Sequence, residues 1–120
     1  MRYDANGALL ETEIPGLKPV HRGKVRDIYD MGDSLLFVAT DRISAFDCVM
    51  PNGIPAKGRV LTAMSLFWFN LFSWAPNHVL CSDASKFPAV LKSVEKDLAG
   101  RSILVKKART IPLECIVRGY

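Results

Sequence analysis

A short polar turn between two strand-like segments constrains the fold of this chain more than any other feature. Residues 24–29 alternate polar and apolar side chains, a period of two that predicts a half-buried strand. Residues 35–39, LLFVA, form a continuous apolar run that is typical of a strand covered on both faces. Residues 30–34, DMGDS, have the composition of a turn. The two strands are therefore expected to pair as an antiparallel hairpin.

The remaining segments predict an antiparallel sheet with helices on one face. A polar leader precedes residue 19, and residues 40–58 are rich in the small and polar residues of a long loop. Apolar positions in residues 59–74 follow helical spacing, and we expect this aromatic stripe to pack in the core. Shorter elements are a strand at 78–81, an amphipathic helix at 88–98 with Leu91, Val94 and Leu98 facing inward, and strands at 102–107 and 113–118. This order predicts an α+β fold rather than repeated strand-helix-strand units.

The composition indicates one globular domain or a part of one. Of the 120 residues, 49% are hydrophobic and 23% are charged, which excludes a disordered or fibrous chain. The sequence stops directly after an apolar strand, so we expect it to be cut short. The most hydrophobic run, residues 60–74, is too short and too polar for a bilayer span, which needs about 20 apolar residues. Three widely separated cysteines predict reduced thiols in a cytoplasmic protein and no metal site.

The net charge of +4 predicts an anionic partner. Nucleic acid, phosphorylated metabolites and plain solubility all fit this charge. The basic residues do not gather into an arm or along one helical face, as they often do in nucleic-acid footprints. Small phosphorylated ligands are therefore favoured.

Residues 22–27, RGKVRD, are the first candidate binding segment. Gly23 permits close approach to the backbone, and the neighbouring cations can hold phosphate oxygens through charge-assisted hydrogen bonds. The segment lacks the spacing of a Walker A loop and of the dinucleotide-binding fingerprint. A solvated edge strand with ordinary charges remains the alternative.

Three further positions carry groups suited to an anionic ligand. The loop at residues 41–47, DRISAFD, offers a cation, a hydroxyl and two carboxylates, although caps and surface ion pairs use the same residue types. Lys57 is a candidate phosphate or carboxylate contact or a solvated residue at a helix start. Arg118 follows an apolar strand, where it either grips an anion with its planar fork or pairs with Glu114. His21 and His78 lack the partner spacing of a metal site or a catalytic triad.

Four segments resemble, in the same order, the landmarks of the SAICAR synthetase family. They are RGKVRDIY at 22–29, LLFVATDRISAFD at 35–47, IPAKG at 54–58 and PLECIVRGY at 112–120. The resemblance covers roughly residues 15–120 and is greatest to the longer form of the enzyme, found in yeast and many bacteria. Ala56 departs slightly, since a polar residue or glycine is usual before this Lys-Gly pair.

The resemblance implies a two-lobed α+β fold akin to kinases and ATP-grasp enzymes, with residues 1–120 as its N-terminal, ATP-binding lobe. ATP is then expected in the cleft under the hairpin, with residues 108–113 as the connector beside adenine. The implied ATP contacts are Gly23, Lys24, Val25, Arg26, Ala108, Arg109, Thr110 and Leu113. The implied substrate contacts are Asp41, Arg42, Ser44, Asp47, Lys57 and Arg118.

The reaction implied by the resemblance joins L-aspartate to carboxyaminoimidazole ribotide in purine biosynthesis. The ribotide carboxylate attacks the γ-phosphoryl group of Mg-ATP, and the aspartate amine then displaces phosphate from the acyl phosphate. Positioning and charge neutralisation dominate such chemistry, and a basic hairpin and Mg²⁺ supply both. The acidic metal-binding residues of the family lie downstream of this sequence, so we expect no metal site in this chain and no activity from it alone.

Two other classes of protein compete with this interpretation. A non-catalytic basic α+β module would bind nucleic acid or a phosphorylated ligand, but most aromatic residues fall in the predicted helix rather than on strands where bases stack. A protein-kinase-like lobe needs a loop with two or three glycines, and residues 22–27 contain only Gly23.

Overall fold

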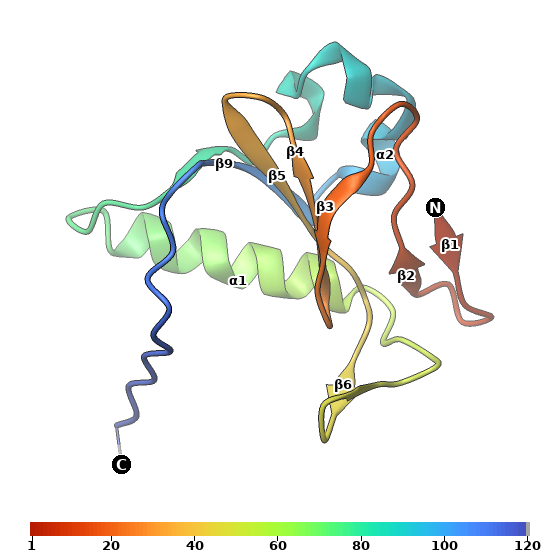
Figure 1. Cartoon of the computed structure of the whole chain (residues 1–120), viewed down its shortest axis with the longest axis horizontal. Coiled ribbons are helices and arrows are strands. Elements are labelled where there is room, and N and C mark those ends of the chain that lie inside the picture. Colours follow the sequence, from red (N-terminus) through yellow and green to blue (C-terminus); the bar gives the residue numbers. More distant parts are fainter. Residues whose placement is uncertain (120) are drawn as a thin grey trace.

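The computed structural model describes residues 1–119, and a five-stranded antiparallel sheet lies at the centre of this part of the chain (Figure 1). In spatial order its strands are β3 (Pro19–Arg22), β4 (Arg26–Asp30), β5 (Ser34–Ala39), β9 (Ser102–Lys106) and β8 (Val79–Cys81). The predicted hairpin is confirmed, because β4 and β5 pair in antiparallel register from Arg26 opposite Ala39 to Asp30 opposite Leu35. The predicted strands at 78–81 and 102–107 are confirmed as β8 and β9.

Helices cover both faces of the sheet, whereas the sequence predicted them on one face. The α+β class itself is confirmed. The helix α1 (Lys57–Leu71) crosses one face, and the 3₁₀ turns η1 (Ala84–Lys86) and η2 (Ala89–Val94) lie with α2 (Glu95–Leu98) over the other (Figure 1). The strand β5 is apolar at every central position, so alternate side chains supply an apolar surface to each face.

The main core lies between the sheet and the short helices. Leu36 and Val38 of β5 are buried against Leu91, Val94 and Leu98. These three residues are the ones that the amphipathic pattern of residues 88–98 predicted to face inward. The predicted single helix is instead divided into the 3₁₀ turn η2 and the short helix α2.

The N-terminal segment belongs to the fold, although the sequence predicted a polar leader. The strands β1 (Arg2–Tyr3) and β2 (Leu9–Glu11) pair in antiparallel register. Leu9 and Thr12 are fully buried, and Ile14 joins the main core. In residues 8–14, ALLETEI, charged residues interrupt the apolar ones, so the sequence contains no apolar run long enough to predict a strand.

The helix α1 lies near the predicted residues 59–74, but its large apolar side chains are not in the core. The residues of α1 that are buried against the sheet are Gly58 and Thr62. A Cβ on Gly58 would lie 2.2 Å from the backbone oxygen of Ala39, so only glycine permits this close approach. The aromatic stripe that was predicted to pack in the core is exposed in this chain, and that prediction is wrong.

Residues 107–119 have no regular secondary structure and are exposed along their length. The predicted strand at 113–118 is therefore not formed in the part of the chain that the structure describes. A strand needs the backbone of a neighbouring strand to satisfy its N–H and C=O groups, and residues 1–119 place no strand beside this segment. Tyr120, the last residue of the fourth landmark, lies outside the described residues.

No helix within residues 1–119 has the length and apolar character required to cross a membrane.

Candidate functional site

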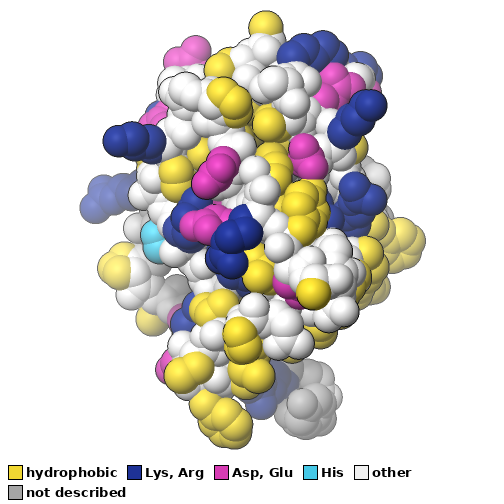
Figure 2. Space-filling view, turned by 90° about the vertical axis from the view of Figure 1, so that its right-hand side faces the viewer, with side chains coloured by type: hydrophobic (Ala, Val, Ile, Leu, Met, Phe, Trp, Pro, Cys, Tyr) yellow, Lys and Arg dark blue, Asp and Glu magenta, His cyan; other side chains and the backbone are white. Residues whose placement is uncertain are grey.

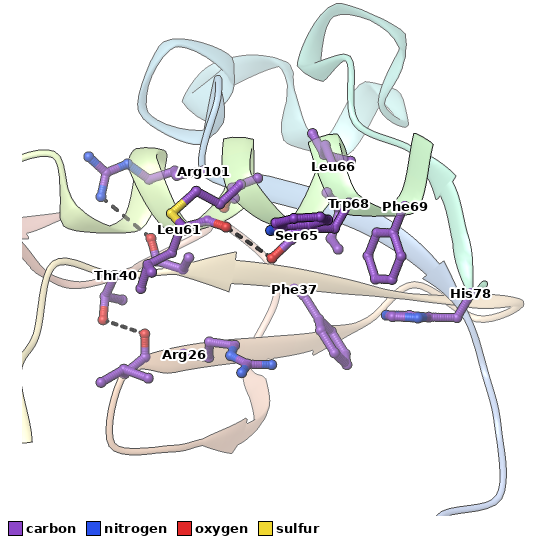
Figure 3. A pocket seen from close by; sticks show the side chains of 15 residues that line it. Arg26, Phe37, Thr40, Leu61, Ser65, Leu66, Trp68, Phe69, His78 and Arg101 are labelled. Atoms are coloured by element: carbon purple, nitrogen blue, oxygen red, sulfur yellow. Dashed lines mark hydrogen bonds between the residues drawn. The ribbon is translucent and has the colours of Figure 1, made fainter. Parts of the chain in front are cut away.

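A cavity of about 380 Å³ lies between α1 and the sheet. Figure 3 shows Leu61, Ser65 and Trp68 of α1 on one side of it and Arg26 and Phe37 from the strands on the other. The lining residues are Val25, Arg26, Phe37, Ala39, Thr40, Leu61, Thr62, Met64, Ser65, Leu66, Trp68, Phe69, His78, Arg101 and Ile103. A mostly apolar cavity with a few polar groups is the usual form of a small-molecule site.

The β3–β4 turn, residues 23–26, borders this cavity. The Gly23 N–H donates to the Arg26 carbonyl at 2.8 Å and closes the turn. Val25 and Arg26 line the cavity, while Lys24 is exposed and its ammonium lies 2.5 Å from the Asp47 carboxylate. The turn that the sequence predicted to bind phosphate therefore lies at the edge of the cavity between α1 and the sheet.

The Arg42 side chain holds the β3–β4 turn by its backbone carbonyls. Its guanidinium donates to the backbone carbonyls of Gly23 at 2.8 Å, Lys24 at 3.1 Å and Arg26 at 3.3 Å. The fourth carbonyl of the turn, that of Val25, accepts from the backbone N–H and the hydroxyl of Thr40. All four carbonyls of the β3–β4 turn are thus bonded to the protein.

The amides of the same turn have the opposite environment. Among the hydrogen bonds of residues 1–119, none is donated by the backbone N–H of Lys24 or of Val25. Free backbone N–H groups of a turn bind anions, and the cationic side chains of Lys24 and Arg26 flank these two. The turn therefore offers donors and positive charge to a phosphate, and the Asp47 carboxylate paired with Lys24 is the acceptor that competes for this charge.

The Arg42 guanidinium is itself held by a buried carboxylate. Asp27 is fully buried, and its Oδ1 accepts from Arg42 at 2.8 Å. Its Oδ2 accepts from the backbone N–H of Thr12 at 3.0 Å and from the Thr12 hydroxyl at 2.6 Å. Burial alone raises the pKa of Asp27, but the hydrogen bonds from Arg42 and Thr12 outweigh it, so that the pKa lies below its usual range. Asp27 is therefore ionised at neutral pH and fixes the direction of Arg42.

Asp41 ties α1 to the sheet. Its fully buried carboxylate accepts from the backbone N–H groups of Leu9 and Gly58, each at 2.8 Å, and lies 3.0 Å from the Arg101 guanidinium. The Gly58 N–H is one of the amides in the first turn of α1, which has no side-chain cap at its N-cap residue. Asp41 thus satisfies a free donor of the helix and carries a charge that suits its N-terminus.

The structure places the predicted substrate residues Asp41 and Arg42 inside the fold. Their polar atoms are bonded to protein groups, which explains their positions without a ligand. Ser44 and Asp47 lie instead in the exposed hairpin of β6 (Ser44–Ala45) and β7 (Cys48–Val49). The backbone of Asp47 has a φ of 64°, in the left-handed region that residues other than glycine seldom adopt. Lys57 is the first residue of α1.

The structure brings together some of the predicted ligand residues but not others. Val25 and Arg26 line the cavity, and Gly23 and Lys24 belong to the same turn. The remaining predicted residues all lie in the irregular segment 107–119, outside the cavity lining; they are Ala108, Arg109, Thr110, Leu113 and Arg118. Within the described residues Arg118 forms no ion pair with Glu114, the alternative partner that the sequence suggested.

Several cavity residues were missed at the level of sequence. Phe37 was predicted only as part of a buried strand, and the ring of His78 packs against it at a tilt of 54°, with centroids 6.0 Å apart. Arg101 is buried, and among the described residues its Nε has no hydrogen-bond partner. The alternation of β5 could have identified Phe37 as facing away from the main core. No local signal identifies Arg101, because its position depends on the pairing of β9 with β5.

The described residues contain no group of three or more His, Cys, Asp or Glu side chains placed to hold a metal ion.

Comparison with known proteins gives one consistent match. A family model described as SAICAR synthetase matches residues 19–120. The chain is 60% identical over 113 residues to the phosphoribosylaminoimidazole-succinocarboxamide synthase of Syntrophobacter fumaroxidans, covering 93% of this chain and 38% of that protein. It is 55% identical over 116 residues to the protein of the same name from Desulforapulum autotrophicum, covering 94% and 39% of the two chains.

Solved structures agree with these matches. One titled SAICAR synthase is similar with a TM-score of 0.78 and 44% identity, over 88% of this chain and 39% of that one. The SAICAR synthase of Saccharomyces cerevisiae, complexed with SAICAR, is similar with a TM-score of 0.74 and 44% identity, over 83% and 37%. The chain thus spans less than two fifths of the length of these relatives.

Proposed function

This chain belongs to the SAICAR synthetase family, and from that premise we propose that residues 1–120 supply the nucleotide-binding lobe of an ATP-dependent ligase. The proposed reaction joins L-aspartate to carboxyaminoimidazole ribotide and releases SAICAR, ADP and phosphate. The relatives' name, phosphoribosylaminoimidazole-succinocarboxamide synthase, supports this assignment. We further propose a cytoplasmic location, in keeping with small soluble substrates.

One observation carries the proposal more than any other: the carbonyls of the β3–β4 turn are all bonded inward while the amides of Lys24 and Val25 are free. Such a turn binds an anion at its outer surface. The apolar cavity beside it is large enough for a flat apolar group, at about 380 Å³. A nucleotide combines these two features, since its base needs an apolar slot and its phosphates need donors and cations.

The residues of this chain have defined tasks in the proposed reaction. The ribotide carboxylate attacks the γ-phosphorus, the bond from phosphorus to the β,γ-bridging oxygen breaks, and ADP leaves. The aspartate amine then attacks the acyl phosphate and expels phosphate. The amides of Lys24 and Val25 hold phosphate oxygens, and the side chains of Lys24 and Arg26 offset the charge that develops on them.

Magnesium is implied by the family resemblance, but the described residues do not fit a metal site. The acidic side chains beside the turn are engaged by the protein: Asp27 is fully bonded within the fold, Asp47 is paired with Lys24, and Glu11 is paired with Arg22. No cluster of ligands stands within residues 1–119. We therefore assign Mg²⁺ no ligand and no step in this chain.

The remaining predicted residues keep their proposed roles in the complete enzyme. Residues 108–113 would lie beside the adenine, and Arg118 would bind the anionic ribotide through its planar guanidinium. The exposed hairpin that carries Ser44 and Asp47 would face the aspartate or ribotide site. None of these side chains lines the cavity. The support for their roles therefore comes from the family motifs alone.

A nucleic-acid-binding module is the competing function, and the surface argues against it. Basic and acidic side chains intermingle on the face shown in Figure 2 and do not form a continuous basic surface there. Exposed cations also pair with acids, as Arg2 does with Glu11 and Lys107 with Asp30. Paired charges attract the phosphates of a nucleic acid only weakly.

Calorimetry with Mg-ATP tests the proposal on the chain as it stands. We expect binding in the high micromolar range or weaker, about −5 kcal/mol or less favourable, because the other side of a nucleotide cleft is not part of this chain. Lys24→Ala should abolish this binding, while the matched change Lys86→Ala, at an exposed lysine paired with Asp83, should leave it unchanged. Tight binding of duplex DNA with no response to ATP would establish the competing function instead.

A further inference from the structure

The N-terminal strand β2 is bonded to the residues that support the β3–β4 turn. The strands β1 and β2 form a hairpin of their own beside β3, which is an edge strand of the central sheet (Figure 1). The carbonyl of Leu10 in β2 accepts from the Arg42 guanidinium at 2.5 Å. Thr12, which directly follows β2, donates to Asp27 with both its backbone N–H and its hydroxyl. The N-terminal segment is thus joined to both members of the buried ion pair behind the turn.

The hydroxyl of Thr12 lies in a fully enclosed group of polar side chains. Thr12, Asp27 and Tyr29 are each 0% exposed. The Thr12 hydroxyl oxygen lies 2.6 Å from Asp27 Oδ2 and 2.7 Å from the Tyr29 hydroxyl oxygen. Water does not reach these groups, so each needs a partner within the protein. The effect of each hydroxyl therefore depends on which group donates to which.

The ionised carboxylate of Asp27 determines the direction of these hydrogen bonds. A carboxylate without a proton only accepts, so the single hydroxyl proton of Thr12 is directed to Asp27. The Thr12 oxygen then accepts from the Tyr29 hydroxyl. Burial raises the pKa of Tyr29, so its phenol keeps the proton that it donates. Asp27 therefore receives its hydroxyl donor from Thr12, and Tyr29 acts on Asp27 only through Thr12.

Arg42 carries this arrangement to the free amides of the turn. Its guanidinium donates to Asp27 Oδ1 and to the carbonyls of Gly23 and Lys24. The peptide groups of the turn are trans, so each C=O and the next residue's N–H lie in one plane and point in opposite directions. Holding the Gly23 carbonyl fixes the N–H of Lys24, and holding the Lys24 carbonyl fixes the N–H of Val25. Arg42 therefore directs both free amides away from itself.

We propose that Thr12 is a positioning residue for the anion-binding turn and acts through Asp27 and Arg42. Its hydroxyl holds one oxygen of Asp27, so that the other stays directed at Arg42. A turn that is ordered beforehand binds an anion more tightly, because less conformational entropy is lost on binding. Thr12 does not line the cavity and precedes residues 19–120, the segment that the family model matches. The effect on affinity rests on the proposed nucleotide site, whereas the effect on the order of the turn does not.

Three substitutions separate positioning of the turn from support of the core. Thr12→Val keeps the branched shape and the backbone N–H that bonds Asp27, but it removes the hydroxyl. Thr12→Ser keeps the hydroxyl and removes only the methyl group. Tyr29→Phe is the matched control, since it removes the other hydroxyl of the group and leaves the hydrogen bond from Thr12 to Asp27 in place. A role in stability alone would make Thr12→Val and Tyr29→Phe equivalent in their effect on the turn.

Nitrogen-15 relaxation of the nucleotide-free chain measures the order of the turn. In Thr12→Val we expect the order parameters of the Lys24 and Val25 amides to fall from about 0.85, the value of a rigid backbone, to below about 0.6. The amides of Leu36 and Val38 in the main core should keep their order. Thr12→Ser and Tyr29→Phe should both leave the turn ordered. If Thr12→Val does not fold, Thr12→Cys takes its place and should show the same fall, because a thiol is a weak donor.

Titration with Mg-ATP, followed by amide NMR, measures the consequence for binding. Thr12→Val should raise the dissociation constant at least fivefold, and Thr12→Ser should keep it within a factor of two. The matched control Tyr29→Phe should also keep it within a factor of two.

The two measurements give distinct results for the role of Thr12 and for the proposed function. Unchanged order of the turn amides in Thr12→Val, or an equal loss of order in Tyr29→Phe, would overturn the proposal. Unchanged Mg-ATP affinity in a Thr12→Val chain whose turn has lost its order would overturn the link to anion binding. If the unchanged chain does not bind Mg-ATP at all, the proposed function fails, while the relaxation data still decide whether Thr12 positions the turn.

Discussion

Replacing Arg42 by methionine should destabilise the chain strongly, because the change removes the partner of a buried charge. Arg42 is 7% exposed and lies 2.8 Å from the fully buried Asp27 carboxylate. The same guanidinium holds carbonyls of the β3–β4 turn and donates to the Leu10 carbonyl. Removing one partner of a buried ion pair costs about 3 to 5 kcal/mol. We expect a loss of that size, which is a large part of the roughly 5 to 15 kcal/mol that stabilises a typical domain.

Urea unfolding followed by circular dichroism measures this loss. With a slope of about 2 kcal/mol per molar urea, a loss of about 4 kcal/mol lowers the midpoint by about 2 M. The double variant Arg42→Met, Asp27→Asn should be more stable than Arg42→Met alone, because the unpaired charge is then absent and the two changes are coupled. A loss below about 1 kcal/mol, with strictly additive effects, would show that the pair behaves as an exposed one and would refute the reasoning.

Four other predictions follow from the contacts of single residues. The pKa of Asp27 is lowered in the folded state, so the stability it contributes is complete above its unfolded pKa of about 3.9 and is lost as pH falls through the lower folded pKa. Asp27→Asn should therefore reduce the dependence of the free energy of unfolding on pH between about pH 5 and pH 2, as measured by urea unfolding at a series of pH values. Gly58→Ala forces a Cβ to within 2.2 Å of a carbonyl oxygen of β5, and thermal unfolding should show a loss of about 1 to 3 kcal/mol or more, whereas a gain would mean that α1 shifts freely. Asp47→Asn removes the partner of Lys24, and calorimetry should show tighter Mg-ATP binding than in the unchanged chain, whereas weaker binding would mean that Asp47 helps to hold the nucleotide. In the complete enzyme, Arg118→Lys should weaken ribotide binding by about 1.5 to 3 kcal/mol with nucleotide binding nearly unchanged. A change in ribotide affinity of less than about a factor of two would show that Arg118 does not bind the ribotide.

The sequence predicted best those elements whose evidence is local. The β4–β5 hairpin, β8 and β9 were identified because strand periodicity and turn composition depend on only a few adjacent residues. The inward residues Leu91 and Leu98 were also correct, although the helix that carries them is interrupted by a 3₁₀ turn. Short-range patterns determine such features whatever the rest of the molecule does.

The prediction for α1 was wrong for a physical reason. Helical periodicity assigns large apolar residues to the buried side, but it does not say which neighbour buries them. Here the sheet accepts only the small Gly58 and Thr62 at closest approach, and Phe67 and Trp68 stay exposed instead of packing in the core. The predicted strand at 113–118 is absent for a related reason, since a strand exists only beside a pairing partner.

The candidate site was predictable only in part. The β3–β4 turn was recognised from its glycine and flanking cations, and the structure places it beside the cavity. The roles of Asp41 and Arg42 as internal supports were not, because their partners lie between 15 and 60 residues away in sequence, from Asp27 for Arg42 to Arg101 for Asp41. Composition suggests that a charged loop residue faces a ligand; only the fold shows that these two are enclosed.

Amide NMR spectra of the chain titrated with Mg-ATP test the central claim most directly. The amide resonances of Lys24 and Val25, whose N–H groups are free donors, should change their chemical shifts most. The amide resonances of the cavity residues Phe37 and Ile103 should change with them. Mg-ADP should give the same pattern, and Mg-AMP should affect the cavity residues while leaving the turn nearly unchanged. Millimolar Mg-ATP that shifts neither the turn nor the cavity, or shifts residues elsewhere on the chain, would contradict the assignment of this lobe to nucleotide binding.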